Sequence, residues 1–247
     1  MFKKYYQMNP GTKEIIEFLK KDEIKNCSHI GFIYNNKINS ITKTGNYIII
    51  KGRSDRDWVY ISCSNEKELE LSLNEIDSKD KCFAVIEDWM MPVFMQRYKL
   101  KWKLSVLKFV LKKRIKNISR FENISPLRIE DAEYIYLNSL YKEYLSVEYI
   151  KERIENGISA GICIYTDGKL AAWGITQDDN AIGFLHVLDS CRGKGFAKQI
   201  VEYIALKISE ANFLPFAYIQ ESNTPAINLV QKIGFQKINK VHWFEIE

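Results

Sequence analysis

Long uncharged segments and secretory signals are both absent from this sequence. No stretch without Lys, Arg, Asp or Glu exceeds eleven of the 247 residues, which is too short for a helix that crosses a bilayer. The N-terminal segment MFKKYYQMNPGTKE lacks the apolar core of a signal peptide. We therefore expect a cytoplasmic protein that does not bind a membrane.

Cysteine and histidine are few and scattered. The five cysteines form no CxxC pair, and their odd number fits reduced thiols better than a disulfide framework. The three histidines, His29, His186 and His242, lie far apart, and none stands at metal-ligand spacing from a cysteine. We expect no metal site.

The phosphate-binding motifs of two common nucleotide folds are also missing. No GxxxxGK[ST] string occurs. A Rossmann fingerprint would need Gly or Ala at position 198, which is Lys198, and it would lie in a parallel β-α-β unit. Three strands in hairpin succession are expected here instead.

The composition is that of a globular protein long enough for two domains, with 46% hydrophobic and 27% charged residues. The net charge of +5 is unevenly divided: residues 1–118 carry 23 basic and 14 acidic side chains, and residues 119–247 carry 13 and 17. We predict a divergent N-terminal α/β domain over 1–118 and a second domain over 119–247. For the basic stretch 99–116 we favour a solvated face over contact with nucleic acid or acidic lipid. The sequence does not specify an oligomeric state.

The first half is predicted to mix helices and strands. One helix is expected to begin at Thr12 and end near Lys21, and another to begin at Ser64 or Asn65 and end near Ile76. The expected strands are Gly31–Tyr34, Tyr47–Ile50, Trp58–Cys63, Cys82–Ile86 and Tyr98–Leu104. The apolar run 89–95 is interpreted as core or domain interface, with a pocket wall as the alternative.

The second half is predicted to follow the order β-α-α-β-β-β-α-β-α-β. Its expected strands are Ser125–Arg128, Ile158–Tyr165, Lys169–Gln177, Ile182–Leu188, Phe216–Gln220 and Phe235–Ile246, with a hairpin turn at Thr166–Gly168. Its expected helices are Glu130–Lys142 with Ile135 and Leu140 inward, one from Ser146 to Gly157, Lys194–Ala211, and Thr224–Ile233 closed by Gly234.

A glycine-containing turn, Arg192-Gly-Lys-Gly-Phe-Ala-Lys198, stands between an expected strand and an expected helix. Glycine permits positive φ and lets a ligand approach the backbone. A helix N-terminus offers unpaired N–H donors and the positive end of the helix dipole. With three cations beside it, this turn predicts a site for anionic phosphates. The alternative is a basic turn that happens to contain glycines.

Residues 192–197 read RGKGFA and residues 223–235 read NTPAINLVQKIGF. They resemble the Q/R-x-x-G-x-G/A loop and the N-x-x-A-x-x-L-Y-x-x-x-G-F signature of the GNAT superfamily of acyl-CoA-dependent N-acyltransferases. The element order is also similar, and the resemblance spans residues 124–247. The layout in two halves resembles glycine N-acyltransferase relatives.

The resemblance implies a mixed, mainly antiparallel sheet flanked by helices, with a degenerate copy of the same fold as the first half. It implies acetyl-CoA or another short acyl-CoA as co-substrate, with its thioester between the strands 182–188 and 216–220. The implied acyl-CoA contacts are Leu185, His186, Val187, Arg192, Gly193, Lys194, Gly195, Phe196, Ala197, Lys198, Asn223 and Asn228.

Three positions depart from the family pattern. The frequent tyrosine acid falls on Val230, and two glutamate bases fall on Ala181 and Tyr218. A thiolate with a pKa near about 8.5 can leave without full protonation, so these departures do not exclude catalysis. The candidate catalytic residues are His186, Tyr218 and Glu221. The alternative for His186 is a histidine packed in the strand, and the alternative for Glu221 is an ordinary solvated acid.

We therefore expect a GNAT-type N-acetyltransferase or acyltransferase. It would move the acyl group to a primary amine of a small molecule or peptide, by direct attack in a ternary complex. A non-catalytic acyl-CoA-binding module is the alternative. A nucleic-acid-associated protein is a weaker third interpretation.

Overall fold

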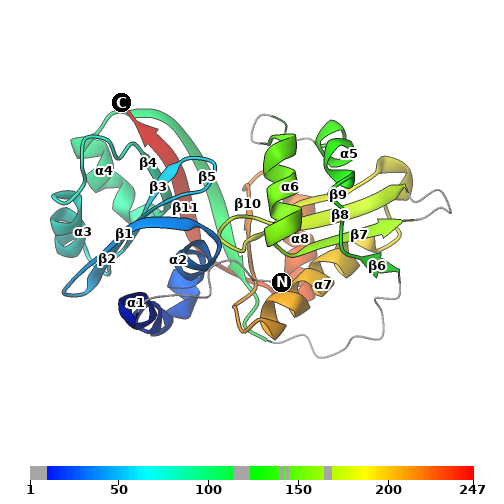
Figure 1. Ribbon diagram of the computed structural model, residues 1–247, viewed down its shortest axis with the longest axis horizontal. Helices are drawn as coiled ribbons and strands as arrows, with labels where there is room; N and C mark the ends of the chain where they lie inside the picture. Colours follow the sequence, from blue (N-terminus) through cyan, green and yellow to red (C-terminus); the bar gives the residue numbers. More distant parts are fainter. Residues whose placement is uncertain (1–9, 114–122, 140–141, 143–144, 164–168) are drawn as a thin grey trace.

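The computed structural model describes residues 10–113, 123–139, 142, 145–163 and 169–247. Two lobes, each built mainly from one half of the chain, share one sheet flanked by helices (Figure 1). The eleven strands of this sheet lie in the order β1-β2-β3-β4-β11-β5-β10-β9-β8-β7-β6, and most neighbours are antiparallel. The predicted fold class, a mixed and mainly antiparallel sheet flanked by helices, is confirmed.

The first half contributes four helices and five strands in the described residues. They are α1 Pro10–Lys20, α2 Glu23–Asn35, β1 Lys37–Thr44, β2 Tyr47–Arg53, β3 Asp57–Ser62, α3 Glu66–Leu73, β4 Cys82–Glu87, α4 Met91–Arg97 and β5 Leu100–Val110. The predicted Asn65 cap of α3 is confirmed, because its side chain accepts the Glu68 amide hydrogen.

The second half follows the predicted element order. Its elements are β6 Ile124–Ser125, α5 Asp131–Leu137, α6 Val147–Asn156, β7 Ser159–Cys163, β8 Leu170–Thr176, β9 Ile182–Val187, α7 Phe196–Glu210, β10 Phe216–Ile219, α8 Thr224–Ile233 and β11 Gln236–Ile246. Ser146 caps α6, and Gly234 ends α8 at a φ of 112°. Ile135 is buried as predicted. Leu140 and the turn 166–168 lie outside the described residues.

The predicted strand Gly31–Tyr34 is wrong, because this segment lies in α2. Asp22 caps that helix by accepting the Lys25 amide hydrogen. Residues 26–33 are all buried, so the sequence lacks the amphipathic period by which a helix differs from a buried strand. Two further elements are not predicted from the sequence: β1, a largely exposed polar strand, and the short helix α4.

The apolar run 89–95 packs in the first lobe's core. It forms a short 3₁₀ turn and α4. Phe94 is fully buried, and its ring centroid lies 5.0 Å from those of Phe83 and Phe244. Trp89 and Met95 remain exposed. The core interpretation is confirmed for Met90, Met91, Val93 and Phe94, whereas Pro92 is exposed.

Each lobe's part of the sheet is completed by a strand from the other half. β11, the last strand, lies between β4 and β5, while β5 also pairs with β10 of the second lobe. Apart from this exchange the lobes repeat one pattern: two helices, three antiparallel strands, a helix, a strand parallel to the third, a helix and a final strand. The boundary at residue 118 stays a prediction, and the sheet continues from one lobe to the other.

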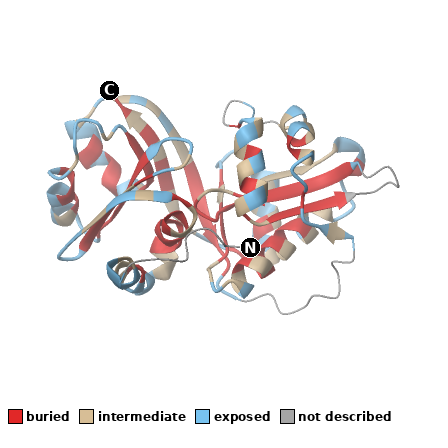
Figure 2. Ribbon diagram, viewed as in Figure 1, coloured by how far each residue is buried: buried red, intermediate tan, exposed pale blue. Residues whose placement is uncertain are grey.

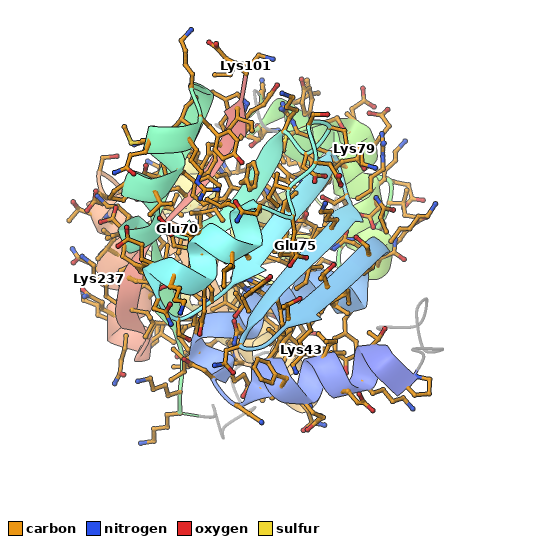
Figure 3. All side chains as sticks on the ribbon, turned by 90° about the vertical axis from the view of Figure 1, so that its left-hand side faces the viewer. Lys43, Glu70, Glu75, Lys79, Lys101 and Lys237 are labelled. Atoms are coloured by element: carbon orange, nitrogen blue, oxygen red, sulfur yellow. The ribbon has the colours of Figure 1, made fainter. Side chains whose placement is uncertain are left out.

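Buried residues form the interior of the molecule and charged residues lie mainly at its surface. Buried residues concentrate in the central strands and in the helix faces against them (Figure 2). The first lobe carries both charge signs at its surface, among them Lys43, Glu70 and Lys79 (Figure 3). In the basic stretch Lys101 pairs with Glu245 at 2.8 Å. None of the helices in the described ranges has the length and apolar character that a bilayer crossing requires.

We expect Phe244→Ala, in the exchanged strand β11, to lower the free energy of unfolding by about 3–5 kcal/mol. The Phe244 ring is fully buried and stacks on Phe83 with 5.3 Å between centroids, so truncation leaves a cavity. Chemical denaturation measures the change. Met95→Ala in the same lobe, where the side chain is 60% exposed, should change stability by less than about 0.5 kcal/mol. Native stability in Phe244→Ala would contradict this account of β11.

Candidate acyl-CoA site

β9 and β10 run parallel but pair at one point, Ile182 with Ala217. Beyond that pair β9 continues to Val187 and β10 to Ile219 without further pairing between them. The two strands therefore diverge toward their C-terminal ends and form a V. Along a V of this kind, main-chain N–H and C=O groups that a neighbouring strand would occupy are left for an extended ligand.

A β-bulge lies in β9 beside this V. Between two regular pairs with β8, Phe184 and Leu185 together face only Gly174. Phe184 has a φ of 48°, a left-handed value that is costly for a residue with a side chain. A bulge bends its strand and redirects the backbone groups that follow, here those of Leu185 to Val187. This bulge is not predictable from the sequence, because phenylalanine does not signal positive φ.

The turn before α7 is open. Gly193 and Gly195 have φ values of 77° and 80°, and a Cβ on either would meet none of the described atoms within 4 Å. Gly195 is the N-cap of α7, whose first turn has neither a capping side chain nor an acidic residue in the described structure. The first N–H groups of the helix are therefore available to an anion. Arg192, Lys194 and Lys198 are exposed beside them.

The first lobe has a helix at the equivalent place, α3 after β3, but its N-terminus is closed. Asn65 Oδ1 accepts the Glu68 amide hydrogen (3.0 Å), and Glu68 Oε2 accepts the Ser64 amide hydrogen (2.7 Å). Glu66 adds a second carboxylate to the first turn. These side chains use the free donors and repel an anion. Of the two equivalent helix starts, α7 is the one suited to phosphate.

The second predicted cofactor segment lies in α8. Asn223 caps this helix, since its side-chain oxygen accepts the Ala226 amide hydrogen (3.1 Å). Asn228 is exposed one turn later. Val230, at the position of the family's tyrosine, is 4% exposed and belongs to the core between α7, α8 and the sheet. The cofactor contacts assigned to Asn223 and Asn228 stay predictions.

His186 stacks on Trp173, with ring centroids 4.6 Å apart and planes at 25°. Burial, followed by the positive charge of Arg192, lowers the pKa of His186, so its imidazole is neutral at pH 7. Trp173 itself is fully buried. These contacts favour the interpretation of His186 as a histidine packed in its strand. A catalytic role for His186 stays a prediction.

Glu221 follows β10 and pairs with Lys240 of β11 at 2.6 Å. Its side chain is 54% exposed, so the pair is screened by solvent. This placement favours the interpretation of Glu221 as a solvated acid over its interpretation as a base that faces the acceptor amine. The catalytic assignment of Glu221 stays a prediction.

Tyr218 leads to a buried polar cluster that the sequence analysis missed. Its hydroxyl is buried, and its partner in the β5 register is Lys108, which is 1% exposed. Asp179, in the turn before β9, is 2% exposed. Asp179 Oδ1 accepts the Ala181 amide hydrogen (3.0 Å), whereas Oδ2 and the Tyr218 hydroxyl have no hydrogen-bond partner among the described residues. Burial, and next the Asp178 carboxylate, raises the pKa of Asp179 to about 7.

Helix α2 of the first lobe contacts the turn that carries Asp179. Asn35 Nδ2 donates to the Asp178 carbonyl oxygen (3.1 Å), and Asn36 Nδ2 donates to the same oxygen (2.9 Å). Gly31 permits this approach, because a Cβ there would lie 1.9 Å from the Asp179 carbonyl oxygen. The first lobe therefore packs directly against the start of β9.

Residues 159–244, which hold the V and the open turn, match the family described as FR47-like protein. The chain carries a GNAT-type domain. The predicted resemblance to the GNAT superfamily is thereby confirmed for residues 159–244. No curated protein sequence matches the chain. Within the described ranges, no group of three or more His, Cys, Asp or Glu is arranged to hold a metal ion.

Solved structures share the fold of the whole chain, including the lobe that precedes the GNAT-type domain. A Drosophila protein superposes with a TM-score of 0.76 at 18% identity, over 96% of each chain. An acetyltransferase of the GNAT family from Colwellia psychrerythraea has a TM-score of 0.53 at 15% identity, also over 96% of each chain. A GCN5-related N-acetyltransferase from Kribbella flavida has a TM-score of 0.57 at 11% identity, over 90% of this chain and 94% of its own. At these identities the likeness shows the fold.

The raised pKa of Asp179 predicts how stability depends on pH. A carboxyl group whose pKa is higher in the folded state binds its proton more tightly there, so stability falls as pH rises from about 4 to about 7. We expect Asp179→Asn to match the wild type near pH 4 and to be more stable at pH 8, by on the order of a few kcal/mol. Thermal unfolding between pH 4 and pH 8 measures this difference.

The matched control is Asp57→Asn, which changes a carboxylate that is 63% exposed. Its stability should follow that of the wild type at every pH. An Asp179→Asn variant that is less stable than the wild type at pH 8 would show that the ionised carboxylate stabilises the fold.

Proposed function

We propose that this protein is an N-acyltransferase that uses acetyl-CoA or another short acyl-CoA as its acyl donor. The acceptor is a primary amine of a small molecule or peptide, and the amine attacks the thioester directly while both substrates are bound. The coenzyme A diphosphate is bound by the N–H groups at the start of α7 and by Arg192, Lys194 and Lys198. Its pantetheine arm lies along the backbone of Leu185 to Val187.

The open turn before α7 is the single observation that carries this proposal. Gly193 and Gly195 leave room for a ligand at the backbone, and α3 shows the alternative, in which Asn65 and Glu68 satisfy the helix start. An open, uncapped helix start with three exposed cations is suited to a diphosphate. The divergence of β9 from β10 supplies a place for an extended arm beside it.

The departures at Val230 and Ala181 are compatible with turnover. Positioning two substrates in one complex can supply up to about 7–11 kcal/mol. One backbone N–H directed at the thioester oxygen supplies about 3–4 kcal/mol, and we assign that donor to the segment near Val187. The thiolate of coenzyme A leaves without a dedicated acid, because its pKa is near about 8.5.

Gly195→Glu should weaken binding of coenzyme A at least about 100-fold, because it places a carboxylate at the diphosphate position. Isothermal titration calorimetry with coenzyme A and acetyl-CoA measures binding, and thiol release with a panel of primary amines measures turnover. Gly45→Glu is the matched control. Gly45 also has a positive φ (57°) in open surroundings but lies in the turn between β1 and β2, so this variant should bind as the wild type does. Equal affinity in wild type and Gly195→Glu would refute the proposed site.

A non-catalytic acyl-CoA-binding module is the second candidate. It is favoured by Val230, which is buried in the core where the family's tyrosine would supply a proton. This candidate predicts saturable binding of acetyl-CoA with no acylated product from any amine in the panel.

A further inference from the structure

The buried cluster of Asp179, Tyr218 and Lys108 lies at the closed end of the V. The V closes at the pair of Ile182 with Ala217, and Tyr218 is the next residue along β10. On the other strand, Asp179 hydrogen-bonds to the amide of Ala181, the residue before Ile182. A thioester held between β9 and β10 therefore has this cluster next to it.

Two groups of the cluster are buried with unused hydrogen-bonding capacity. Asp179 Oδ2 and the Tyr218 hydroxyl lack a partner within the described part of the chain. Lys108, in contrast, is satisfied: its Nζ donates to the Lys25 carbonyl oxygen (2.8 Å) and lies 3.4 Å from Ser28 Oγ. An unpaired buried acceptor costs free energy, and such groups in native proteins often belong to functional sites. An amine nitrogen is a donor that could satisfy Asp179 Oδ2.

We propose that Asp179 is the general base of this protein, which binds the acceptor ammonium group through Oδ2 and removes its proton. This inference rests on the acyltransferase function proposed above. Tyr218 is assigned as a positioning residue, whose unpaired hydroxyl supplies a second polar group for the acceptor beside Asp179. The acceptor end of the site is thus formed by both lobes, because α2 packs on the turn that carries Asp179.

The reaction balances with the residues named. Asp179 takes one proton from the ammonium group and leaves a neutral amine. The amine lone pair forms the C–N bond with the thioester carbonyl, and the C–S bond then breaks. The second proton on nitrogen passes to the departing thiolate, and Asp179 returns its own proton to solvent once the product has left. The net products are an amide, free coenzyme A and one proton.

The surroundings of Asp179 suit a base that works near neutral pH. Burial and the Asp178 carboxylate raise its pKa to about 7; the Ala181 amide, then the Tyr218 hydroxyl and the Lys108 ammonium, oppose this rise. The ionisable groups that interact with Asp178 or Asp179 come from several elements around the turn. They are Asp178 itself, Cys27 in α2, Asp55 before β3, Tyr60 in β3, Lys108 in β5, Tyr149 and Arg153 in α6, and Tyr218 in β10. Cys27, Tyr60, Tyr149 and Tyr218 are all held neutral by pKa values raised through burial. The carboxyl of Asp179 has a pKa of about 7, and burial raises the pKa of the neighbouring Asp178 carboxyl as well.

The test compares Asp179→Asn with wild type in three assays: calorimetry with acetyl-CoA, thiol release with water as acceptor, and thiol release with glycine, phenethylamine and spermidine. We expect unchanged acetyl-CoA affinity. We expect kcat to fall about 100-fold or more, and the acidic limb of the wild-type kcat/KM profile, near pH 7, to disappear. Tyr218→Phe should keep that limb and lose less activity. Asp57→Asn, far from the V in the sheet order, should behave as wild type.

Each outcome decides between the two proposals. If Asp179→Asn keeps the wild-type kcat and pH profile, Asp179 is not the base, while the acyltransferase function stands. Binding of acetyl-CoA by the wild type with no thiol release to water or to any amine would also overturn the base, and would favour the binding module. Absence of acetyl-CoA binding in the wild type would refute the proposed function itself, together with the inference that rests on it.

Discussion

A single backbone pair between two parallel strands determines the geometry of the candidate site. Ile182 and Ala217 are both buried and hold β9 and β10 together at one point. If the strands stayed paired further along, their main-chain N–H and C=O groups would hydrogen-bond to each other and would not be available to a ligand. If they did not pair at all, the V would have no closed end. The open turn before α7 lies toward one side of this pair and the Asp179 cluster toward the other, so both ends of the proposed reaction are located by the same contact.

The two lobes repeat one arrangement of elements yet differ at the helix start where an anion would bind. In the first lobe, Asn65 and Glu68 satisfy the main-chain donors of α3 and bring negative charge to them. In the second, two glycines at positive φ leave the start of α7 uncovered. A repeated fold therefore does not imply a repeated site, because a few side chains decide whether a helix start is filled by the protein or left for a ligand.

Local signals predicted much of the second half. Ser146 at the start of α6 and Gly234 at the end of α8 mark boundaries that the structure reproduces, because capping and left-handed glycine act over a few neighbouring residues. The glycine turn at Gly193 and Gly195 was predictable from the sequence for the same reason.

The features that sequence reasoning missed depend on contacts far along the chain. α2 has the composition of a buried strand because it is enclosed by packing on most sides. The bulge at Phe184 and the insertion of β11 into the first lobe arise from tertiary pairing. Asp178 and Asp179 resemble any acidic turn in sequence. Only the approach of α2 at Gly31 and the burial of Asp179 distinguish the second acid from the first.

The exchange of final strands also bears on how the chain acquires its structure during synthesis. β4 needs β11 as its neighbour, and partners such as Cys82 and Glu245 are separated by most of the chain. The first lobe thus stays unfinished on the ribosome, with one edge of β4 exposed, until β11 has emerged. Long-range pairing of this kind slows folding and exposes strand edges to other chains. Loss of β11 would therefore disrupt the first lobe as well as the second.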